Sequence, residues 1–175
     1  MASTSTATRC YIGLGSNLDD PVGQIETALH ELHALPTTSC VKTSSLYHSQ
    51  PMGPADQPDY INAVAELTTS LPAEALLNEM LQIETNHGRL RTSHDSKKNG
   101  PRTLDLDLLL YDGLRLDLPG LTLPHPGLHQ RDFVVLPLLE IAPLLTIPGL
   151  GRLSTLQQMS TNHGAFRGDR PNWRL

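Results

Sequence analysis

The order of residue patterns along this 175-residue chain predicts an α+β fold built as one domain. Four segments alternate apolar and polar residues, which is typical of half-buried strands. Two segments between them repeat apolar residues every three or four positions, as helices packed on one side do. The order is strand, helix, strand, strand, helix, strand, and we expect a further hairpin and a short helix after it.

The first half of the chain begins with a Ser/Thr/Ala-rich stretch, residues 1–8, which we expect to be a disordered tail ahead of a single domain at 9–175. Residues 9–14 predict the first strand, and a Gly-Ser-Asn turn ends it. Asp20 can cap a helix that starts at Pro21, and helical spacing continues to about His33. Residues 40–48 predict the second strand.

A Pro- and Gly-rich loop at residues 50–58 leads into the third strand, residues 60–68. Its alternation predicts one face of Ile61, Ala63, Ala65 and Leu67 and an opposite face of Tyr60, Asn62 and Val64. Ser70 can cap the second helix, and Gly88 can end it. In the fourth strand, the alternation places Leu104, Leu106, Leu108 and Leu110 on one face.

Beyond the fourth strand, Asp112 and Gly113 predict a hairpin turn into residues 114–118. Apolar residues at 133–139 predict a short third helix, interrupted near Pro137. The predicted fold is therefore a ferredoxin-like βαββαβ core with an additional C-terminal hairpin and short helix.

The composition of the chain limits the classes of function that it can have. The net charge of −5 and the pI near 5.8 argue against a dedicated nucleic-acid-binding protein. Five of the 13 Lys and Arg residues nevertheless fall within residues 89–102, which favours a small anionic ligand. No apolar run approaches the roughly 20 residues that span a bilayer, and the two cysteines are isolated. We expect a cytoplasmic monomer with no membrane or nucleic-acid partner.

The most informative motif is the pair Asp105 and Asp107 on the fourth strand. Residues two apart on a strand point to the same face, roughly 6.6 Å apart, so the two carboxylates lie side by side. Paired Asp oxygens are ligands that Mg²⁺ prefers. A solvated strand face is the better reading of most such pairs, but Arg102 and a basic loop precede this one. The combination favours a site for metal and phosphate.

Other residues could complete such a site. The polar loop from Arg89 to Lys98 can close over phosphates and exclude water, and we expect it to be open without ligands. Tyr60 and Asn62 share a strand face, where a ring can stack on a ligand and an amide can both donate and accept hydrogen bonds. His125 could donate to a phosphate. The P-loop and nucleophile-elbow motifs are absent from the sequence, and the dinucleotide fingerprint is only half present.

Four segments resemble the 6-hydroxymethyl-7,8-dihydropterin pyrophosphokinase family of folate biosynthesis, also called 2-amino-4-hydroxy-6-hydroxymethyldihydropteridine diphosphokinase. They are residues 11–18, 51–62, 100–111 and 123–133, which follow one another in the family's order, and the middle two are highly specific. The resemblance implies a ferredoxin-like fold and an ATP-dependent pyrophosphokinase. Such an enzyme transfers diphosphate from ATP to 6-hydroxymethyl-7,8-dihydropterin and releases AMP.

The resemblance also implies roles for particular residues. The pterin-binding residues would be Met52, Tyr60, Asn62 and Phe133. Two Mg²⁺ ions would be bound by Asp105 and Asp107. The nucleotide-binding residues would be Glu84, Arg91, Lys98, Arg102, Leu108, His125 and Arg131. The catalytic residues would be Arg89, Arg102 and Asp107. The chain departs from the family at Asn99, where many members have a Trp that covers the pterin, and at Pro126 and Leu81, which replace a common Tyr and Gln.

The residue patterns themselves leave two rivals open. RNA-recognition modules share the βαββαβ order, but they need several aromatic residues and a Lys/Arg-Gly-Phe/Tyr-type run on the third strand, where this chain has one aromatic residue and no such run. A metal-dependent nucleotidyltransferase could place two Asp residues on a similar sheet, but it would not need the Tyr60 and Asn62 pair.

Overall fold

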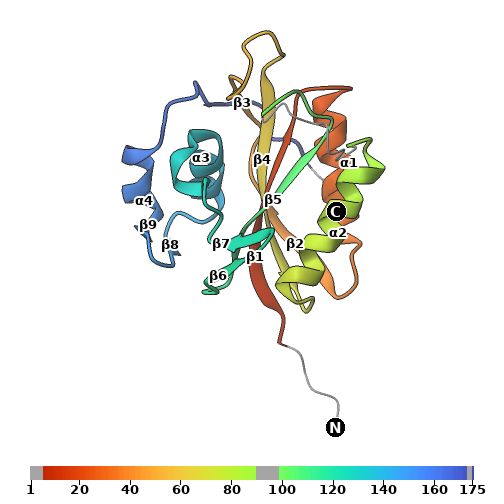
Figure 1. Ribbon diagram of the computed structural model, residues 1–175, viewed down its shortest axis with the longest axis vertical. Coiled ribbons are helices and arrows are strands. Elements are labelled where there is room, and N and C mark those ends of the chain that lie inside the picture. Colours follow the sequence, from red (N-terminus) through yellow and green to blue (C-terminus); the bar gives the residue numbers. More distant parts are fainter. Residues whose placement is uncertain (1–5, 90–98, 173–174) are drawn as a thin grey trace.

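The computed structural model describes residues 6–89, 99–172 and 175, and in these residues an antiparallel sheet lies between two layers of helices (Figure 1). The sheet runs in the order β10-β3-β4-β1-β5, and β2 also pairs with β4. The strands of this sheet are β1 (Thr8–Ser16), β2 (Thr38–Thr43), β3 (Tyr47–Ser49), β4 (Tyr60–Thr69), β5 (Asp105–Tyr111) and β10 (Phe166–Arg167).

One face of the sheet carries α1 (Pro21–His33) and α2 (Ala73–Asn86), and the other carries α3 (Asp132–Ile141) and α4 (Leu153–Leu156) (Figure 1). The smaller elements are β6 (Leu116–Leu118), β7 (Leu121–Leu123), η1 (Leu128–Gln130), β8 (Thr146–Ile147), β9 (Gly151–Arg152) and η2 (Gln157–Met159). Within the described part of the chain, no helix has both the length and the apolar character to cross a membrane.

Strand alternation builds two apolar cores. Ile12 on β1 and the alternating apolar residues of β4 pack against α1 and α2 in the first core. Tyr11 and Val64 point to the opposite face and pack against α3 in the second core. The predicted division of the third strand into two faces is therefore confirmed. The same alternation gives β4 and β5 a polar stretch at one end, beside the beginning of α3.

The predicted ends of the first long helix and the predicted end of the second are also confirmed. Asp20 caps α1 by accepting a hydrogen bond from the Gly23 N–H, and Pro21 is the first helical residue. Gly88 follows α2 with a φ of +84°, a conformation that glycine adopts without strain. Ser70, however, is not the capping residue predicted for α2, because Pro72 occupies that position.

The second strand was predicted as one segment and is two. Its ends pair with opposite ends of β4, β2 beside Thr69 and β3 beside Tyr60. Between them Ser44 donates its N–H to the Val64 carbonyl, and Ser45 donates its N–H to the Glu140 carboxylate on α3. The backbone pairing with β4 is interrupted there because Ser45 donates to a residue of the helix layer and not to the neighbouring strand.

Three predictions about the second half are corrected. The turn at Asp112 and Gly113 does not join a paired hairpin, because β6 pairs with β7 around the turn at Gly120. Pro137 does not interrupt α3. Proline has no backbone N–H, so the helix lacks one hydrogen bond there, and burial of the helix offsets that loss. Leu110 lies in the second core, not with Leu108, because the pairing of β5 with β1 skips one residue there.

Candidate active site

A pocket of about 220 Å³ opens where β1, β4 and β5 meet the beginning of α3. The polar ends of β4 and β5 form one side, and Phe133 and Val134 of α3 form another. Ser49, at the end of β3, and Gln50 and Met52, which follow β3, also line the pocket. Residues that are far apart in the sequence thus surround one space.

The floor of the pocket depends on a glycine of β1. A Cβ atom on Gly15 would lie 3.4 Å from Asn62 Oδ1 and 3.7 Å from the ring of Tyr60. Any longer side chain at this position would therefore enter the space in front of these two residues. Gly15 leaves the polar edge of Asn62 and the ring of Tyr60 open to a ligand.

Asn62 is 5% exposed, and its amide orientation is set by its neighbours. Its Nδ2 donates to Ser49 Oγ at 2.8 Å and to the Tyr47 carbonyl at 3.3 Å. Both donors are used, so the acceptor Oδ1 is the atom presented towards the pocket. Tyr60 is fixed as well, because its hydroxyl donates to the Gly100 carbonyl at 2.8 Å. Burial raises the pKa of Tyr60, so this hydroxyl keeps its proton.

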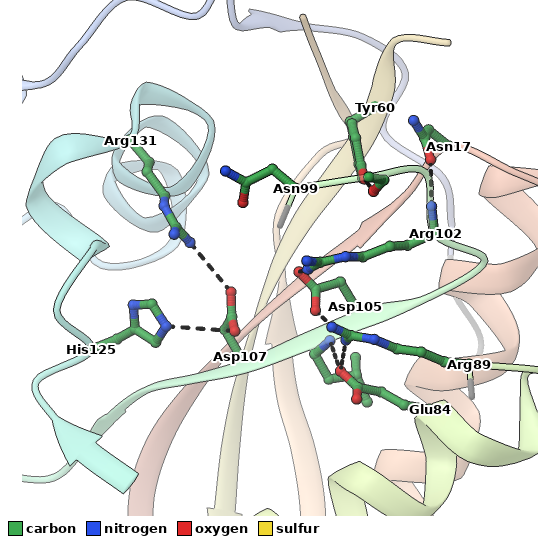
Figure 2. Close-up of polar contacts among 12 residues, drawn as sticks. Asn17, Tyr60, Glu84, Arg89, Asn99, Arg102, Asp105, Asp107, His125 and Arg131 are labelled. Carbon is green, nitrogen blue, oxygen red and sulfur yellow. Dashed lines mark hydrogen bonds and ion pairs between the residues drawn. The ribbon is translucent and has the colours of Figure 1, made fainter. Parts of the chain in front are cut away.

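Asp105 lies between two arginines (Figure 2). Its Oδ2 accepts from Arg102 at 2.7 Å, and its Oδ1 accepts from Arg89. Arg89 also contacts Glu84, whose Oε1 lies 2.5 Å from Nη1. Burial alone would lower the pKa of Arg89, but the neighbouring carboxylates of Asp105 and Glu84 outweigh burial and raise it. Arg89 therefore holds a permanent positive charge next to Asp105.

Asp107 faces the side chains of His125 and Arg131 on the opposite side of the pocket (Figure 2). Its Oδ1 lies 3.5 Å from His125 Nε2, and its Oδ2 lies 3.6 Å from Arg131 Nη1. Burial acts to raise the pKa of Asp107, but contact with His125 and the charges of His125, Arg131 and Arg102 outweigh burial and lower it. Asp107 is an ionised carboxylate, and the three arginines around the aspartate pair make a strongly anion-attracting region.

The aspartate pair suits Mg²⁺ in its chemistry. Both groups are hard carboxylate oxygens on the pocket side of β5. The described residues contain no cluster of three or more His, Cys, Asp or Glu that could hold a metal ion by themselves. An ion at Asp105 and Asp107 would therefore need further oxygens from phosphates and water, which is how Mg²⁺ is usually bound at nucleotide sites.

The structure brings together most of the residues implied by the sequence. The pocket lining includes Met52, Tyr60, Asn62, Arg102, Asp105, Asp107, His125, Arg131 and Phe133. Glu84 is 1% exposed and supports Arg89 from behind, also accepting from the Leu106 N–H at 2.8 Å. Leu108 is 3% exposed and packs in the first core, so the structure does not bring its side chain to the pocket.

Two of the implied nucleotide-binding residues, Arg91 and Lys98, lie outside the described residues, as does the rest of the predicted lid at 90–98. Asn99, at the end of this segment, lines the pocket and accepts a hydrogen bond from Gln57 Nε2 at its carbonyl.

Sequence reasoning missed the residues that hold the pocket in shape. Ser49 orients Asn62, and Asp132 anchors the segment around His163 beside Phe133. Asn17, which the sequence indicated only as part of a turn, joins three loops. The only indication in the sequence was that each of these polar residues interrupts an apolar or turn-rich stretch and belongs to no helix or strand periodicity.

Comparisons with known proteins agree with the family resemblance found in the sequence. The sequence pattern of the family described as 7,8-dihydro-6-hydroxymethylpterin-pyrophosphokinase (HPPK) matches residues 11–143. The chain is 45% identical over 153 residues to the 2-amino-4-hydroxy-6-hydroxymethyldihydropteridine pyrophosphokinase of Haemophilus influenzae, covering 87% of this chain and 93% of that protein. It is 47% identical over 140 residues to the protein of that name from Pseudomonas aeruginosa, covering 80% and 84%.

A solved structure shares the fold. Wild-type Plasmodium falciparum HPPK-DHPS superposes with a TM-score of 0.64 at 14% identity. The match covers 87% of this chain but only 41% of that longer protein. At this identity the likeness concerns the fold, whereas the family match rests on sequence and spans the pocket-lining residues from Gly13 to Val134. The chain belongs to the 7,8-dihydro-6-hydroxymethylpterin-pyrophosphokinase family.

Proposed function

We propose that this protein transfers diphosphate from ATP to 6-hydroxymethyl-7,8-dihydropterin, producing AMP and the pterin diphosphate in folate biosynthesis. The observation that carries this proposal is a single pocket with two chemically different halves. One half offers the Asn62 acceptor beside the rings of Tyr60 and Phe133, and the other holds the aspartate pair among cations. A flat, hydrogen-bonding ring would thus lie next to a polyphosphate.

The pterin half supplies orientation. Asn62 Oδ1 can accept from an N–H on the edge of the pterin, and Phe133 and Tyr60 can contact its faces. Met52 is 42% exposed at the rim and can cover the ring. Holding the ring this way directs its hydroxymethyl group towards Asp105 and Asp107, and such positioning lowers the entropic part of the barrier.

The phosphate half supplies charge. Arg102, His125 and Arg131 line the pocket around the aspartates, and Arg89 adds its charge from behind Asp105. We assign contacts with the triphosphate to these residues, with Arg89 and Arg102 neutralising charge that develops during transfer. Two Mg²⁺ ions held by Asp105 and Asp107 would supply further neutralisation and alignment of the phosphates.

In the transfer, the hydroxymethyl oxygen forms a bond to the β-phosphorus of ATP. The bond between that phosphorus and the oxygen bridging to the α-phosphate breaks, and AMP leaves with the electron pair. The hydroxyl proton passes to solvent. A lowered pKa makes Asp107 a weak base, so we assign it to binding and alignment of the reacting groups and not to proton removal.

We further propose that the domain, residues 9–175, is a ferredoxin-like βαββαβ unit with β6, β7 and α3 as additions. The element order β1-α1-β2-β4-α2-β5 and the pairing of β4 with β1 and β2 support this assignment. We also propose a cytoplasmic monomer with no nucleic-acid or membrane partner. The free thiols of Cys10 and Cys40 are consistent with a reducing compartment.

Product analysis tests the function. With ATP, Mg²⁺ and the reduced hydroxymethylpterin, we expect AMP and pterin diphosphate in equal amounts and neither without the pterin. Release of inorganic diphosphate with a nucleotidyl product would instead indicate a nucleotidyltransferase. Formation of ADP, or AMP formation that does not depend on the pterin, would overturn the proposal. Calorimetric titration of the pterin with a non-hydrolysable ATP analogue provides the binding counterpart, and an RNA-binding module would show no pterin binding.

A further inference from the structure

A segment beyond the matched family pattern borders the pocket. The pattern ends at residue 143, and the chain continues through α4 and η2 to β10. In Figure 1 this C-terminal segment, in blue, leaves the layer of α4 and crosses towards β3. Thr161 donates its N–H to the Gln130 carbonyl at 3.0 Å, and Phe166 pairs with His48 on β3. We call residues 161–167 the strap.

Asp132 fastens the strap at the first residue of α3. It is 7% exposed, and its carboxylate accepts hydrogen bonds on both oxygens. Oδ2 accepts from the backbone N–H groups of His163 at 2.8 Å and Ala165 at 3.1 Å. Oδ1 accepts from the Phe133 N–H at 2.8 Å and lies 3.1 Å from His163 Nδ1. One buried carboxylate therefore holds both Phe133 and His163.

His163 in turn contacts two walls of the pocket. The edge of its ring meets the ring of Phe133 with centroids 5.2 Å apart and planes at 75°. Its carbonyl accepts from the Gln50 N–H at 3.0 Å. Phe133 and Gln50 both line the pocket, whereas His163 does not. The geometry of this contact is a favourable edge-to-face arrangement.

We propose that His163, anchored by Asp132, is a positioning residue that fixes the ring of Phe133 for ligand binding, so that the strap is part of the pterin site's architecture. The effect on pterin binding rests on the proposed function, but the positioning of Phe133 does not. The arrangement keeps the ring of Phe133 in place before a ligand arrives, which lowers the entropic cost of stacking on it.

The first experiment measures the environment of the Phe133 ring by ¹⁹F NMR, without any ligand. The chain contains two phenylalanines, Phe133 and Phe166, so fluorophenylalanine labelling gives two ¹⁹F resonances. The Phe166→Leu variant assigns them. Substituting His163→Asn keeps a donor for Asp132 but removes the ring, and we expect the Phe133 resonance to shift and broaden. An unchanged Phe133 resonance in a folded His163→Asn protein would overturn the proposal.

The second experiment measures binding by calorimetry, with a non-hydrolysable ATP analogue and Mg²⁺ present. Loss of an edge-to-face ring contact should raise the pterin Kd of His163→Asn about two- to tenfold and leave the nucleotide Kd unchanged. His163→Phe restores a ring and should restore the pterin Kd. Arg167→Ala is the matched control, because it frees the strap from Glu140 and Ser45 without touching Phe133. It should lower the unfolding temperature but not the pterin affinity.

The outcomes separate the two proposals. If the wild-type protein does not bind the pterin, the proposed function fails while the ¹⁹F spectra still decide the positioning role. If wild-type protein binds the pterin and His163→Asn binds it equally well, the positioning role in binding is wrong. Equal losses in His163→Asn and Arg167→Ala would indicate that the strap only stabilises the fold, which also contradicts the proposal.

Discussion

Asn17 and Arg102 are joined by two reciprocal hydrogen bonds. The Asn17 N–H donates to the Arg102 carbonyl at 3.0 Å. The Arg102 N–H donates to Asn17 Oδ1 at 2.8 Å, the bond drawn in Figure 2. The Asn17 amide group also donates to Gln57 and to the Pro58 carbonyl. Asn17 thus ties the end of β1 to the loop before β5 and to the Pro-rich loop, and it holds the backbone from which Arg102 reaches Asp105.

Replacement of Asn17 by alanine should destabilise the protein and weaken the site together. Asn17 is 3% exposed, so the variant leaves buried partners unpaired, at roughly 1–3 kcal/mol for each unsatisfied group. Urea unfolding should show the loss of stability. Asn17→Asp keeps the acceptor for Arg102 and should retain more activity than Asn17→Ala. Equal activity in the two variants would show that the bond to Arg102 does not matter for catalysis.

Asp105→Asn and Asp107→Asn should each nearly abolish turnover while the fold stays intact. Each change removes a charged ligand from the proposed metal site, and losing several kcal/mol of charge stabilisation lowers the rate about 100-fold or more. Steady-state kinetics at saturating Mg²⁺ measures the effect. Asp112→Asn is the control, because Asp112 is exposed just past β5 and its φ of +48° is one that asparagine tolerates. Near-normal turnover in either site variant would contradict the metal assignment.

The parts of the site that lie on regular strands could be predicted from the sequence. Side chains alternate on a strand by local geometry, so Tyr60 with Asn62 and Asp105 with Asp107 had to share faces. The alternation could not reveal the skipped residue near Leu110 or the break between β2 and β3. Both depend on which partner a segment bonds to, and that choice is made by the whole fold.

The residues that orient the site could not be predicted in this way. Asn17 meets Arg102 across 85 positions, and Asp132 meets His163 across 31. A single polar residue in an irregular segment has no period, and its partner is set by the path of the chain. Sequence therefore indicated the groups proposed to contact ligands, whereas the structure was needed to find the groups that hold them.

Asn62→Ala should weaken pterin binding far more than nucleotide binding. The variant removes the acceptor Oδ1 and leaves Ser49 and the Tyr47 carbonyl without their donor. A pterin N–H that is buried without this acceptor costs roughly 1–3 kcal/mol of binding free energy, which corresponds to about 5- to 150-fold in the pterin Kd. Calorimetry with each ligand measures both affinities. Ser49→Ala is an informative companion, because it frees the amide to rotate and should give a smaller loss of the same kind. Equal losses for both ligands would move Asn62 out of the pterin site.

Glu140→Gln should destabilise the protein at neutral pH, and the difference should shrink as the medium becomes acidic. Burial acts to raise the pKa of Glu140, but hydrogen bonds from Ser45 and Tyr47 and the charge of Arg167 outweigh burial and hold it below its ordinary value of 4.5. A carboxyl group whose pKa is lower in the folded than in the unfolded state stabilises the fold at pH values above the unfolded pKa. That contribution is lost as the pH falls through the folded pKa, when both states bind the proton.

Urea unfolding of the wild type and of Glu140→Gln from neutral pH to below 4.5 measures this dependence. The difference in free energy of unfolding should be constant at neutral pH and decline in the acidic range. Glu79→Gln, at an exposed position on α2, is the control for removing one carboxylate from the surface. The Glu140 carboxylate joins Ser45 and Tyr47 to α3, so the decline should coincide with loosening of the β3 edge. The Ser45 N–H donates to the Glu140 carboxylate, so hydrogen exchange at this amide reports that loosening directly. A difference that persists unchanged at low pH would mean that the shape of the Glu140 side chain, and not its charge, holds α3 against β3.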